Sequence, residues 1–353
     1  MNHEVFMARA IQLAERGRYT TTPNPRVGCV LVKDGQIVGE GFHARAGEGH
    51  AEVNALAQAG AHAQGATAYV TLEPCSHQGR TPPCADGLIQ AGIKTVVCGM
   101  EDPNPQVAGR GFGKLRAAGI EVTSGILQSQ ARALNPGFIK RMEKQLPWVR
   151  VKIAQSQDGR TAMANGESQW ITGPEARADV QKWRAQSCAM VTGAGTVLAD
   201  DPALTVRPKQ LGEDIGRQPK RVLMDRQLRI PQTAQVFNAD APVLWAHSAD
   251  AQPLALPEHV RSLSFVDLGD LLAQLAADDV NEVLVEAGPT LAGAFLASGW
   301  VDELILYTAP KLLGSRGRPM AELPLDHMDQ AIQLDLVDQR LIGADTRSLF
   351  RLN

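Results

Sequence analysis

The chain has 353 residues, a length that fits two domains better than one. Hydrophobic residues make up 44% and charged residues 21%, as in ordinary soluble globular proteins. The net charge of −3 supplies no basic surface for nucleic acid or an anionic membrane, and a 5% aromatic content offers few platforms for base stacking. We therefore expect neither nucleic acid nor a membrane as a partner.

The N-terminus and the cysteines bear on location. The opening stretch "MNHEVFMARAIQLAERG" has the pattern of an amphipathic helix with acidic residues, not the continuous apolar core of a secretory signal. No run approaches the roughly 18 apolar residues that a membrane span requires. Five cysteines, an odd number, do not indicate a disulfide framework. We expect a cytoplasmic protein whose cysteines are buried hydrophobes or metal ligands.

The first half alternates helix-like and strand-like stretches. In chain order the patterns predict a helix over 4–17, a hairpin over 26–43, a helix over 50–60, a strand over 66–74, a helix over 84–92, a strand over 93–100, a helix over 109–119 and a strand over 120–125. The hairpin turn carries the Asp34-Gly35 signal. Strands separated by helices of about ten residues imply a sheet covered by helices.

A second domain is predicted to begin near 146. A charged helical connector over 135–145 precedes a Pro-led apolar strand over 146–162. The patterns then predict a helix over 176–186, strands over 188–195, 220–230 and 241–248, a helix over 268–279, a strand over 281–288, a helix over 290–299 and a strand over 301–310. Segments 207–220 and 321–336 are expected to be loops. Both domains, 1–145 and 146–353, are thus predicted to be α/β.

Four residues of the first half indicate a catalytic metal site. "GHAEVNAL" places His50 and Glu52 at a predicted helix start, "LEPC" places Cys75 just after a strand, and "PPCADGL" places Cys84 at a second helix start. Helix N-termini favour thiolates, because free N–H groups and the helix dipole stabilise negative charge. Two thiolates and one imidazole leave the fourth zinc position open for water, as in catalytic zinc sites.

Glu52 then has a chemical task. Zinc lowers the pKa of its bound water, and a neighbouring carboxylate can accept that proton and deliver it to a leaving group. The order H-x-E, P-C and a second Cys is the signature of zinc-dependent base and nucleoside deaminases. The sequence therefore predicts hydrolytic deamination with Glu52 as the catalytic residue.

The spacing of the cysteines leaves an alternative open. Deaminases of this signature usually carry C-x-x-C, whereas here eight residues separate Cys75 from Cys84. His77, in the intervening segment, could serve as a ligand instead. Cys29, Cys98 and Cys188 lie in apolar strand patterns or beside them and are expected to be inert packing residues.

The N-terminal motifs "TTPNPRVGCVLV", "HAEVNAL", "TLEPCSHQGRTPPC" and "DPNPQVAGRG" resemble the bifunctional deaminase/reductase family of riboflavin biosynthesis. The long spacing with "GRTPPC" is typical of that family. The resemblance implies a cytidine-deaminase-like domain acting on a diaminopyrimidinone that carries a ribosylamino 5′-phosphate. The residues that the resemblance places around this substrate are Asn24, His43, His77, Arg80 and Asn104.

The second half of the sequence has fewer motifs that indicate a function by themselves. "VEAGPTLAGAFL" predicts a strand, a Gly-Pro turn and a helix start that suits a phosphate, although a simple turn explains it equally well. "KIAQSQDGRTA", "GESQWITG", "GAGTVLADDPALTVR" and "VEAGPTLAG" resemble the reductase domain of the same family, which is similar to dihydrofolate reductase. The resemblance implies NADPH-dependent reduction of the ribosyl group to a ribityl chain, and a homodimer formed through this domain.

The resemblance also assigns residues to the reductase site. It places the cofactor against Ala154, Trp170, Thr196, Asp200, Gly288, Pro289, Thr290, Leu291, Ala292, Gly293 and Ala294. It places the substrate against Lys152, Ser168, Thr172, Arg184, Leu204, Arg207 and Glu286, with Lys152 and Glu286 as candidates for steering a proton. Asp200 has an alternative as an ordinary turn or cap residue, and Arg226 departs from the family pattern, so no role is carried over to it.

Three hypotheses follow from these patterns. The first is an enzyme that deaminates with zinc and then reduces with NADPH. The second keeps one activity alone. The third treats the zinc as structural in a module that binds a metabolite or RNA. Glu52 beside an open zinc position and the slightly negative charge favour an enzyme.

Overall fold

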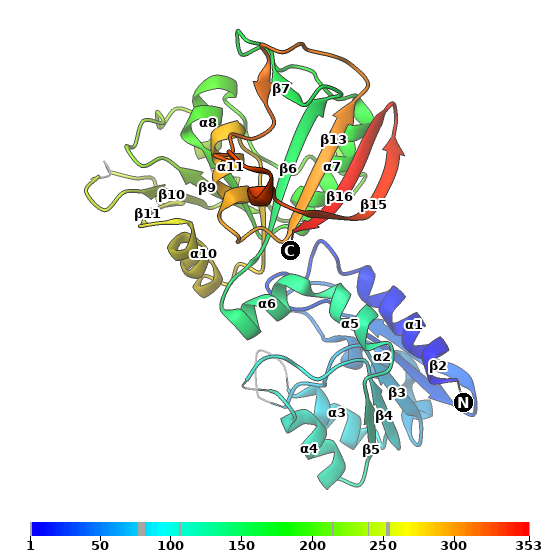
Figure 1. Cartoon of the computed structure of the whole chain (residues 1–353). Helices are drawn as coiled ribbons and strands as arrows, with labels where there is room; N and C mark the ends of the chain where they lie inside the picture. The colour runs from blue at the N-terminus through cyan, green and yellow to red at the C-terminus, as the bar shows by residue number, and fades with distance from the viewer. Residues whose placement is uncertain are drawn as a thin grey trace. The chain divides into compact units, whose positions relative to one another are not determined.

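The computed structural model describes residues 2–352 except 77–81, 106, 214, 239 and 252–254. The chain divides into two compact units, Met1–Gln145 and Leu146–Asn353. Each unit has one large β-sheet with helices on both faces (Figure 1). The α/β class expected for both halves is confirmed.

The first unit is built on a five-stranded sheet of order β2-β1-β3-β4-β5. β1 pairs antiparallel with β2 and β3, whereas β3, β4 and β5 run parallel. The strands are β1 (Gly28–Lys33), β2 (Gln36–Phe42), β3 (Thr67–Val70), β4 (Thr95–Cys98) and β5 (Glu121–Ser124). The helices are α1 (His3–Glu15), α2 (Ala51–Ala59), the 3-10 turn η1 (Gly60–Ala63), α3 (Cys84–Gln90), α4 (Arg110–Ala117), α5 (Gln128–Leu134) and α6 (Pro136–Lys144).

Glycines let two helices lie directly on this sheet. A Cβ on Gly28 of β1 would come within 1.9 Å of the Ala10 carbonyl oxygen in α1, and one on Gly41 of β2 within 2.3 Å of the Ala51 carbonyl oxygen in α2. Helix α1 therefore covers one face, while α2, α3 and α4 cover the other (Figure 1). The tight contact at Gly41 fixes the first turn of α2, where His50 and Glu52 lie.

The second unit has a nine-stranded sheet of order β11-β10-β9-β8-β12-β6-β13-β16-β15. Pairing is parallel from β11 to β13 and antiparallel at β16 and β15. The strands are β6 (Trp148–Ser156), β8 (Ala189–Gly193), β9 (Lys220–Met224), β10 (Val243–His247), β11 (Val260–Ser264), β12 (Glu282–Val285), β13 (Glu303–Ala309), β15 (Leu334–Ile342) and β16 (Asp345–Leu352), and a separate ribbon pairs β7 (Arg160–Ala162) with β14 (Arg318–Pro319).

The helices of the second unit cover both faces of its sheet. They are α7 (Pro174–Gln186), α8 (Ala194–Asp200), α9 (Pro208–Leu211), α10 (Leu268–Ala277) and α11 (Pro289–Ala297), with the 3-10 turns η2 (Gln235–Phe237) and η3 (Met328–Gln330). Helices α10 and α11 pack on one face, and α7 and α8 on the other. Because β6, β8 and β12 are parallel, the segments that follow them meet at one edge of the sheet.

Several expected boundaries were wrong. The predicted strand over 146–162 is two strands, because Gly159 with φ of 75° turns the chain between β6 and β7. The predicted strand over 188–195 ends at Gly193, which is the N-cap of α8. The predicted loop over 207–220 contains α9, and the one over 321–336 contains η3 and the start of β15. Short helices and an exposed edge strand lack the apolar periodicity from which elements are predicted.

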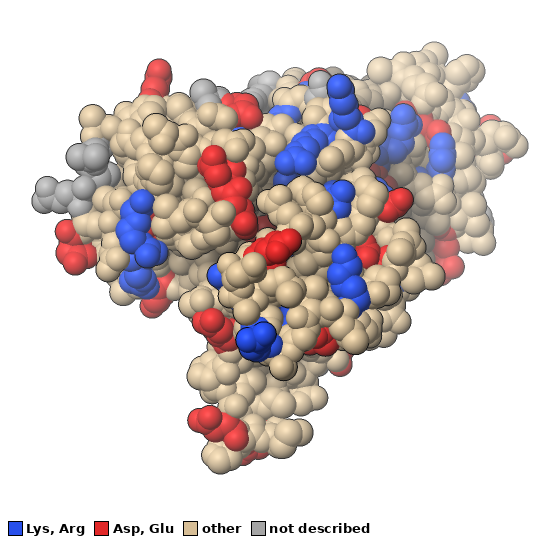
Figure 2. Space-filling model, turned by 90° about the horizontal axis from the view of Figure 1, so that it is seen from above, with Lys and Arg blue, Asp and Glu red and all other residues tan. Residues whose placement is uncertain are grey.

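The surface and the helix lengths agree with the composition. Acidic and basic side chains are interspersed on the face shown in Figure 2, as the small net charge leads one to expect. The longest helices, α1 and α7, have 13 residues, and within the described part of the chain no helix is long and apolar enough to cross a bilayer.

Candidate active sites

The structure brings the three expected metal ligands of the first unit together. His50 is the N-cap of α2, Cys84 is the first residue of α3, and Cys75 lies in the loop that follows β3. The ligand atoms lie within 4.8 Å of one another. His50 Nδ1 is 3.2 Å from Cys84 Sγ and 3.7 Å from Cys75 Sγ.

The cluster fits zinc. Ordinary Zn–S and Zn–N bonds at a tetrahedral angle place sulfur and nitrogen about 3.5 Å apart, and the two observed distances lie on either side of that value. The backbone also supports the thiolate, because the Cys84 N–H donates to Cys75 Sγ at 3.3 Å. Soft sulfur ligands with one imidazole are the donor set that zinc prefers.

Glu52 is positioned for proton transfer beside this cluster. It lies in the first turn of α2, is 3% exposed and lines the same cavity of about 150 Å³ as His50 and Cys75. Burial, reinforced by the charge of Cys75, raises the pKa of Glu52 to about 7. A carboxyl group with a pKa close to neutral can both accept and donate a proton.

His43 and Asn24 form one wall of this cavity. The Asn24 amide nitrogen lies 3.1 Å from His43 Nε2, and His43 Nδ1 lies 3.2 Å from the carbonyl oxygen of Gly49. Burial lowers the pKa of His43, so the neutral ring donates from Nδ1 and accepts at Nε2. The ring packs edge-on against His50, with centroids 5.2 Å apart. His43 thus contacts both Asn24 on the cavity wall and the expected metal ligand His50.

Glu73 is a site residue that the sequence analysis missed. It precedes Cys75 in "LEPC", and its buried carboxylate accepts four backbone N–H bonds, from Asp102 and Gly109 at Oε2 and from Gly111 and Phe112 at Oε1. It therefore ties the loop after β4 and the start of α4 to the segment that carries Cys75. A carboxylate at a helix N-terminus is recognisable from sequence only when it belongs to the same helix.

Of the other residues expected at the deaminase site, the structure describes one and leaves two outside the described residues. Asn104 lies in the loop after β4 and lines the cavity. His77 and Arg80 lie outside the described residues, so the alternative of His77 as a ligand stays open.

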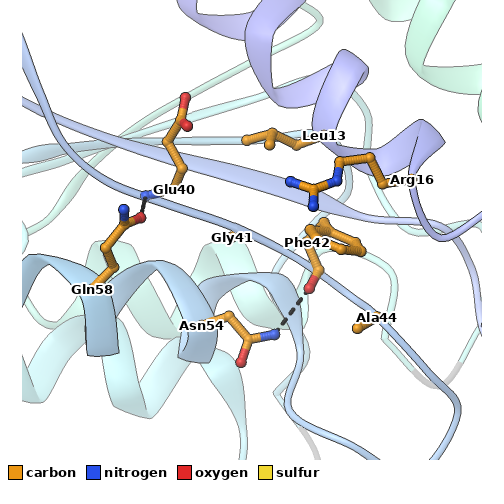
Figure 3. A pocket seen from close by; sticks show the side chains of 8 residues that line it. All are labelled: Leu13, Arg16, Glu40, Gly41, Phe42, Ala44, Asn54 and Gln58. Atoms are coloured by element: carbon orange, nitrogen blue, oxygen red, sulfur yellow. Dashed lines mark hydrogen bonds between the residues drawn. The ribbon is translucent and has the colours of Figure 1, made fainter.

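A second hollow of the first unit, of about 290 Å³, lies beside the edge strand β2 (Figure 3). The Gln58 side chain accepts from the Glu40 N–H at 2.6 Å, and the Asn54 side chain donates to the Phe42 carbonyl at 2.9 Å (Figure 3). Arg16 stacks over the Phe42 ring at 4.5 Å. Side chains of α2 thus cover backbone groups of an exposed strand edge, which protects a sheet from pairing with other chains. The described lining residues of the hollow include one carboxylate, Glu40, and no cluster of possible metal ligands.

In the second unit a buried charge cluster joins three elements. Glu286 follows β12 and forms two hydrogen bonds with Arg184 of α7, at 2.7 and 3.1 Å, while Lys152 Nζ of β6 lies 3.6 Å from Glu286 Oε2. Burial by itself would raise the pKa of Glu286, but Arg184 and Lys152 outweigh it and hold the pKa at about 2. Burial lowers the pKa of Lys152. Glu286 is therefore a fixed anion that places two cations at the edge of the sheet.

The Gly-Pro turn after β12 meets the start of α8. The Gly288 N–H donates to Thr196 Oγ1 at 3.0 Å, and Leu291 would contact a Cβ on Gly193 at 3.2 Å. Farther along α11, Ala292 belongs to the hydrophobic core and a Cβ on Gly293 would come within 2.0 Å of the Glu322 carbonyl oxygen. The residues from 288 to 294, expected to bind the cofactor, therefore have two positions. Gly288 and Leu291 lie at the edge of the sheet, whereas Ala292 and Gly293 pack α11 against its neighbours.

The remaining expected reductase residues are spread over the segments around this edge. Trp170 is 61% exposed, and its ring stacks on Arg177 at 4.5 Å. Thr172 and Leu204 are buried, and Arg207, the N-cap of α9, donates its N–H to Gln181 at 3.0 Å. The others are Ala154 on β6, Ser168 in the segment before α7, Asp200 at the exposed end of α8, and Pro289, Thr290 and Ala294 on α11.

Comparison with known proteins gives one family model for each half of the chain. The model of the cytidine and deoxycytidylate deaminase zinc-binding region matches residues 1–100, and the RibD C-terminal domain model matches residues 147–347. The fold and the His/Cys/Cys cluster thus define the class, a zinc-binding deaminase domain followed by a reductase domain.

Individual relatives extend this to nearly the whole chain. The riboflavin biosynthesis protein RibD of Escherichia coli is 53% identical and that of Haemophilus influenzae 51%, with at least 95% of each chain covered. Among solved structures, RibD of Acinetobacter baumannii (form 1) is 49% identical with a TM-score of 0.94. A diaminohydroxyphosphoribosylaminopyrimidine deaminase/5-amino-6-(5-phosphoribosylamino)uracil reductase of Thermotoga maritima is 37% identical with a TM-score of 0.89. Each of these two structures covers 99% of both chains.

The chain belongs to the RibD family of bifunctional deaminase/reductases. It is an enzyme of riboflavin biosynthesis, with zinc and NADPH as the cofactors of its two domains. The expected activity and cofactors are confirmed, and the comparisons favour the enzyme over a zinc-stabilised binding module.

Proposed function

We propose that the unit of residues 1–145 deaminates the diaminopyrimidinone phosphate and that the unit of residues 146–353 then reduces its ribosyl group. The observation that carries the first assignment is the His50, Cys75 and Cys84 cluster beside Glu52 in one cavity. The observation that supports the second is the cluster of Lys152, Arg184 and Glu286 at the carboxyl edge of parallel strands, where α/β folds bind ligands.

In the deaminase step, zinc held by the three side chains would supply an activated water molecule. Glu52 accepts a proton and delivers it to the leaving amino nitrogen, which departs as ammonia while the ring carbon gains the oxygen of water. Asn24, His43 and Asn104 orient the pyrimidine along the cavity wall. His77 and Arg80 are proposed to complete that wall, with Arg80 on the phosphate.

In the reductase step, NADPH would supply the hydride. Glu286 stays ionised because Arg184 and Lys152 hold its pKa at about 2, so it orients cations and does not donate a proton. Lys152 is the better proton donor, since burial lowers its pKa. Arg184 and Arg207 are proposed as partners of the substrate phosphate.

The remaining assigned residues line the two binding surfaces. The cofactor is proposed to lie against Thr196 and the Gly288 turn, at the N-terminus of α11. Trp170, Ala154 and Asp200 are proposed to flank it, with Ser168, Thr172 and Leu204 toward the substrate.

A homodimer through the second unit is proposed from strand β15. This edge strand leaves Leu336 57% and Leu341 75% exposed, and an edge strand with exposed apolar side chains is prone to associate. A second copy would pair there through the same strand. Light scattering on wild type and on Leu341→Lys tests this: dimeric wild type with a dissociated variant supports the proposal, and a wild-type monomer contradicts it.

A cytoplasmic location is proposed from the cysteines. All five are free thiols, and two of them are metal ligands that a reducing compartment keeps reduced.

The decisive experiment supplies the purified protein with the diaminopyrimidinone phosphate, with and without NADPH. Ammonia release is expected in both reactions, and NADPH oxidation only after deamination. Release of ammonia without any later NADPH oxidation would leave a single live activity, and its absence in both would contradict the proposed deaminase.

A further inference from the structure

One carboxylate of the zinc-site cavity takes no part in the steps described above. Asp102 lies in the loop after β4 and lines the cavity together with His50, Glu52 and Asn104. It is 8% exposed. Its backbone N–H donates to Glu73 Oε2 at 3.2 Å, and its Oδ1 accepts from the Asn104 N–H at 2.8 Å. Both the main chain and the side chain of Asp102 are therefore fixed at the cavity wall.

The second oxygen of Asp102 lacks a donor. Within the described part of the chain, Oδ1 has the one side-chain hydrogen bond of this residue, and Oδ2 has none. The described lining of the cavity contains no Lys or Arg, and its other carboxylates are Glu52 and Glu73. Glu73 is satisfied by four N–H groups. Asp102 Oδ2 is not among the fully enclosed side-chain atoms without a partner, so it is open to the cavity that the residue lines. A ligand in the cavity can therefore donate a hydrogen bond to it.

The substrate class supplies such a donor. A diaminopyrimidinone carries two amino groups, of which one leaves as ammonia and the other remains on the ring. An analogue with a C–H group at that ring position cannot donate this hydrogen bond. A site that is built to hydrogen-bond an N–H group rejects analogues without it strongly, because its own acceptor is then left unpaired.

We propose that Asp102 is a specificity-determining residue of the deaminase site, whose Oδ2 accepts a hydrogen bond from the retained amino group of the pyrimidine. The inference rests on the proposed function, because it assumes that the unit of residues 1–145 binds such a pyrimidine. Glu73 and Asn104 hold the carboxylate in place for this contact, and the ring is thereby oriented with its other amino group toward Glu52.

The test is Asp102→Asn. The amide oxygen can still accept from the Asn104 N–H, but the other position becomes an NH₂ group that opposes the amino group of the substrate. We expect KM for ammonia release to rise at least tenfold, with kcat changed less than about threefold, because the contact orients the substrate without touching the reacting bond. Zinc content and NADPH oxidation with the deaminated intermediate should match wild type.

A binding measurement separates a role in specificity from a structural role. It compares Glu52→Ala, which cannot turn the substrate over, with the double variant Glu52→Ala/Asp102→Asn. The probes are the diaminopyrimidinone phosphate and its analogue with a C–H group in place of the retained amino group. Without the Asp102 change, the protein should bind the first at least tenfold more tightly, and with Asp102→Asn this preference should vanish.

Four outcomes overturn the inference or its basis. An unchanged KM in Asp102→Asn contradicts it, and so does a preference that survives the substitution. If Asp102→Asn loses zinc, the test rests on the protein that carries Glu52→Ala alone. Equal binding of the two probes by that protein contradicts the inference. A wild type that binds the diaminopyrimidinone phosphate but releases no ammonia contradicts the proposed function instead.

Discussion

Glu52 and Glu73 are buried and line the same cavity, yet their surroundings give them different tasks. Glu73 is saturated by four backbone N–H donors and serves as an anchor. Glu52 is buried beside Cys75, and burial, reinforced by the charge of Cys75, raises its pKa to about 7. At the residue scale, the number of fixed donors therefore separates an anchoring carboxylate from one that can exchange a proton.

Substitution of Glu52 tests this separation. Glu52→Ala is expected to lower the rate of ammonia release by a factor of about 10² to 10⁴, the usual contribution of a positioned acid/base group. Zinc should remain at one ion per chain by elemental analysis, because Glu52 is not a ligand. Glu48→Ala, a substitution in the exposed loop before α2, is the matched control and should leave the rate unchanged. Loss of metal in Glu52→Ala would show that the residue helps to hold the ion.

At the element scale, α4 depends on a cap that it does not carry. Its N-cap, Gly109, has no side chain, and Glu73 from the loop after β3 takes over that role. Gly111 makes the approach possible, because a Cβ there would come within 2.1 Å of the Pro74 carbonyl oxygen. The loop between β4 and α4, with Asp102 and Asn104, is positioned by this contact.

Two alanine substitutions on α4 test the contact. Gly111→Ala should destabilise the first unit by about 1–3 kcal/mol, because the helix start must move away from Pro74, and should raise KM for deamination. Gly113→Ala is the control: a Cβ there meets nothing within 4 Å, so higher helix propensity should stabilise the unit by about 0.5–1 kcal/mol. Denaturant unfolding measures both, and equal effects would argue against the contact.

The charge cluster of the second unit predicts a pH dependence. The pKa of Glu286 is lowered to about 2 from an ordinary value of 4.5, so its stabilisation is fully present above pH 4.5 and is lost as the pH falls toward 2. The difference amounts to about 3 kcal/mol. In Glu286→Gln, the free energy of unfolding should be lower than wild type at pH 7, and this gap should narrow as the pH falls from 4.5 toward 2. A constant gap would contradict the ion-pair account.

At the scale of the whole molecule, each unit has its own sheet and its own core. The three expected metal ligands all lie in the first unit, at the N-cap of α2, at the first residue of α3 and in the loop after β3. Metal binding to a folded state stabilises that state. The stability of the two units should therefore respond differently to the metal.

Removal of zinc by a chelator tests this difference. Calorimetry should show the unfolding transition of the first unit lowered by several degrees or more, with the transition of the second unit and NADPH binding unchanged. Return of zinc should restore the first transition. A downward shift of both transitions would mean that the two units unfold together.

The sequence by itself determined the class of the metal site and the family. His50, Cys75 and Cys84 stand at helix starts or just after a strand, and such positions are local, so their spacing and their flanking Pro and Gly residues are legible in one dimension. The division near residue 145 and most elements with a strong apolar period were predictable for the same reason. Short elements such as α5, α8 and α9 were not, because a turn or two of helix carries too little periodicity.

Only the tertiary structure decided which buried polar groups have hydrogen-bond or ion-pair partners, and which residues those partners are. Glu73 and Gly111 are 38 residues apart, and Arg184 and Glu286 are 102 apart, so no local pattern links them. The free oxygen of Asp102 is likewise visible only when the cavity wall is assembled. Sequence patterns report which side chains can do chemistry, whereas burial and the supply of donors, which set charge state and orientation, arise from contacts between distant segments.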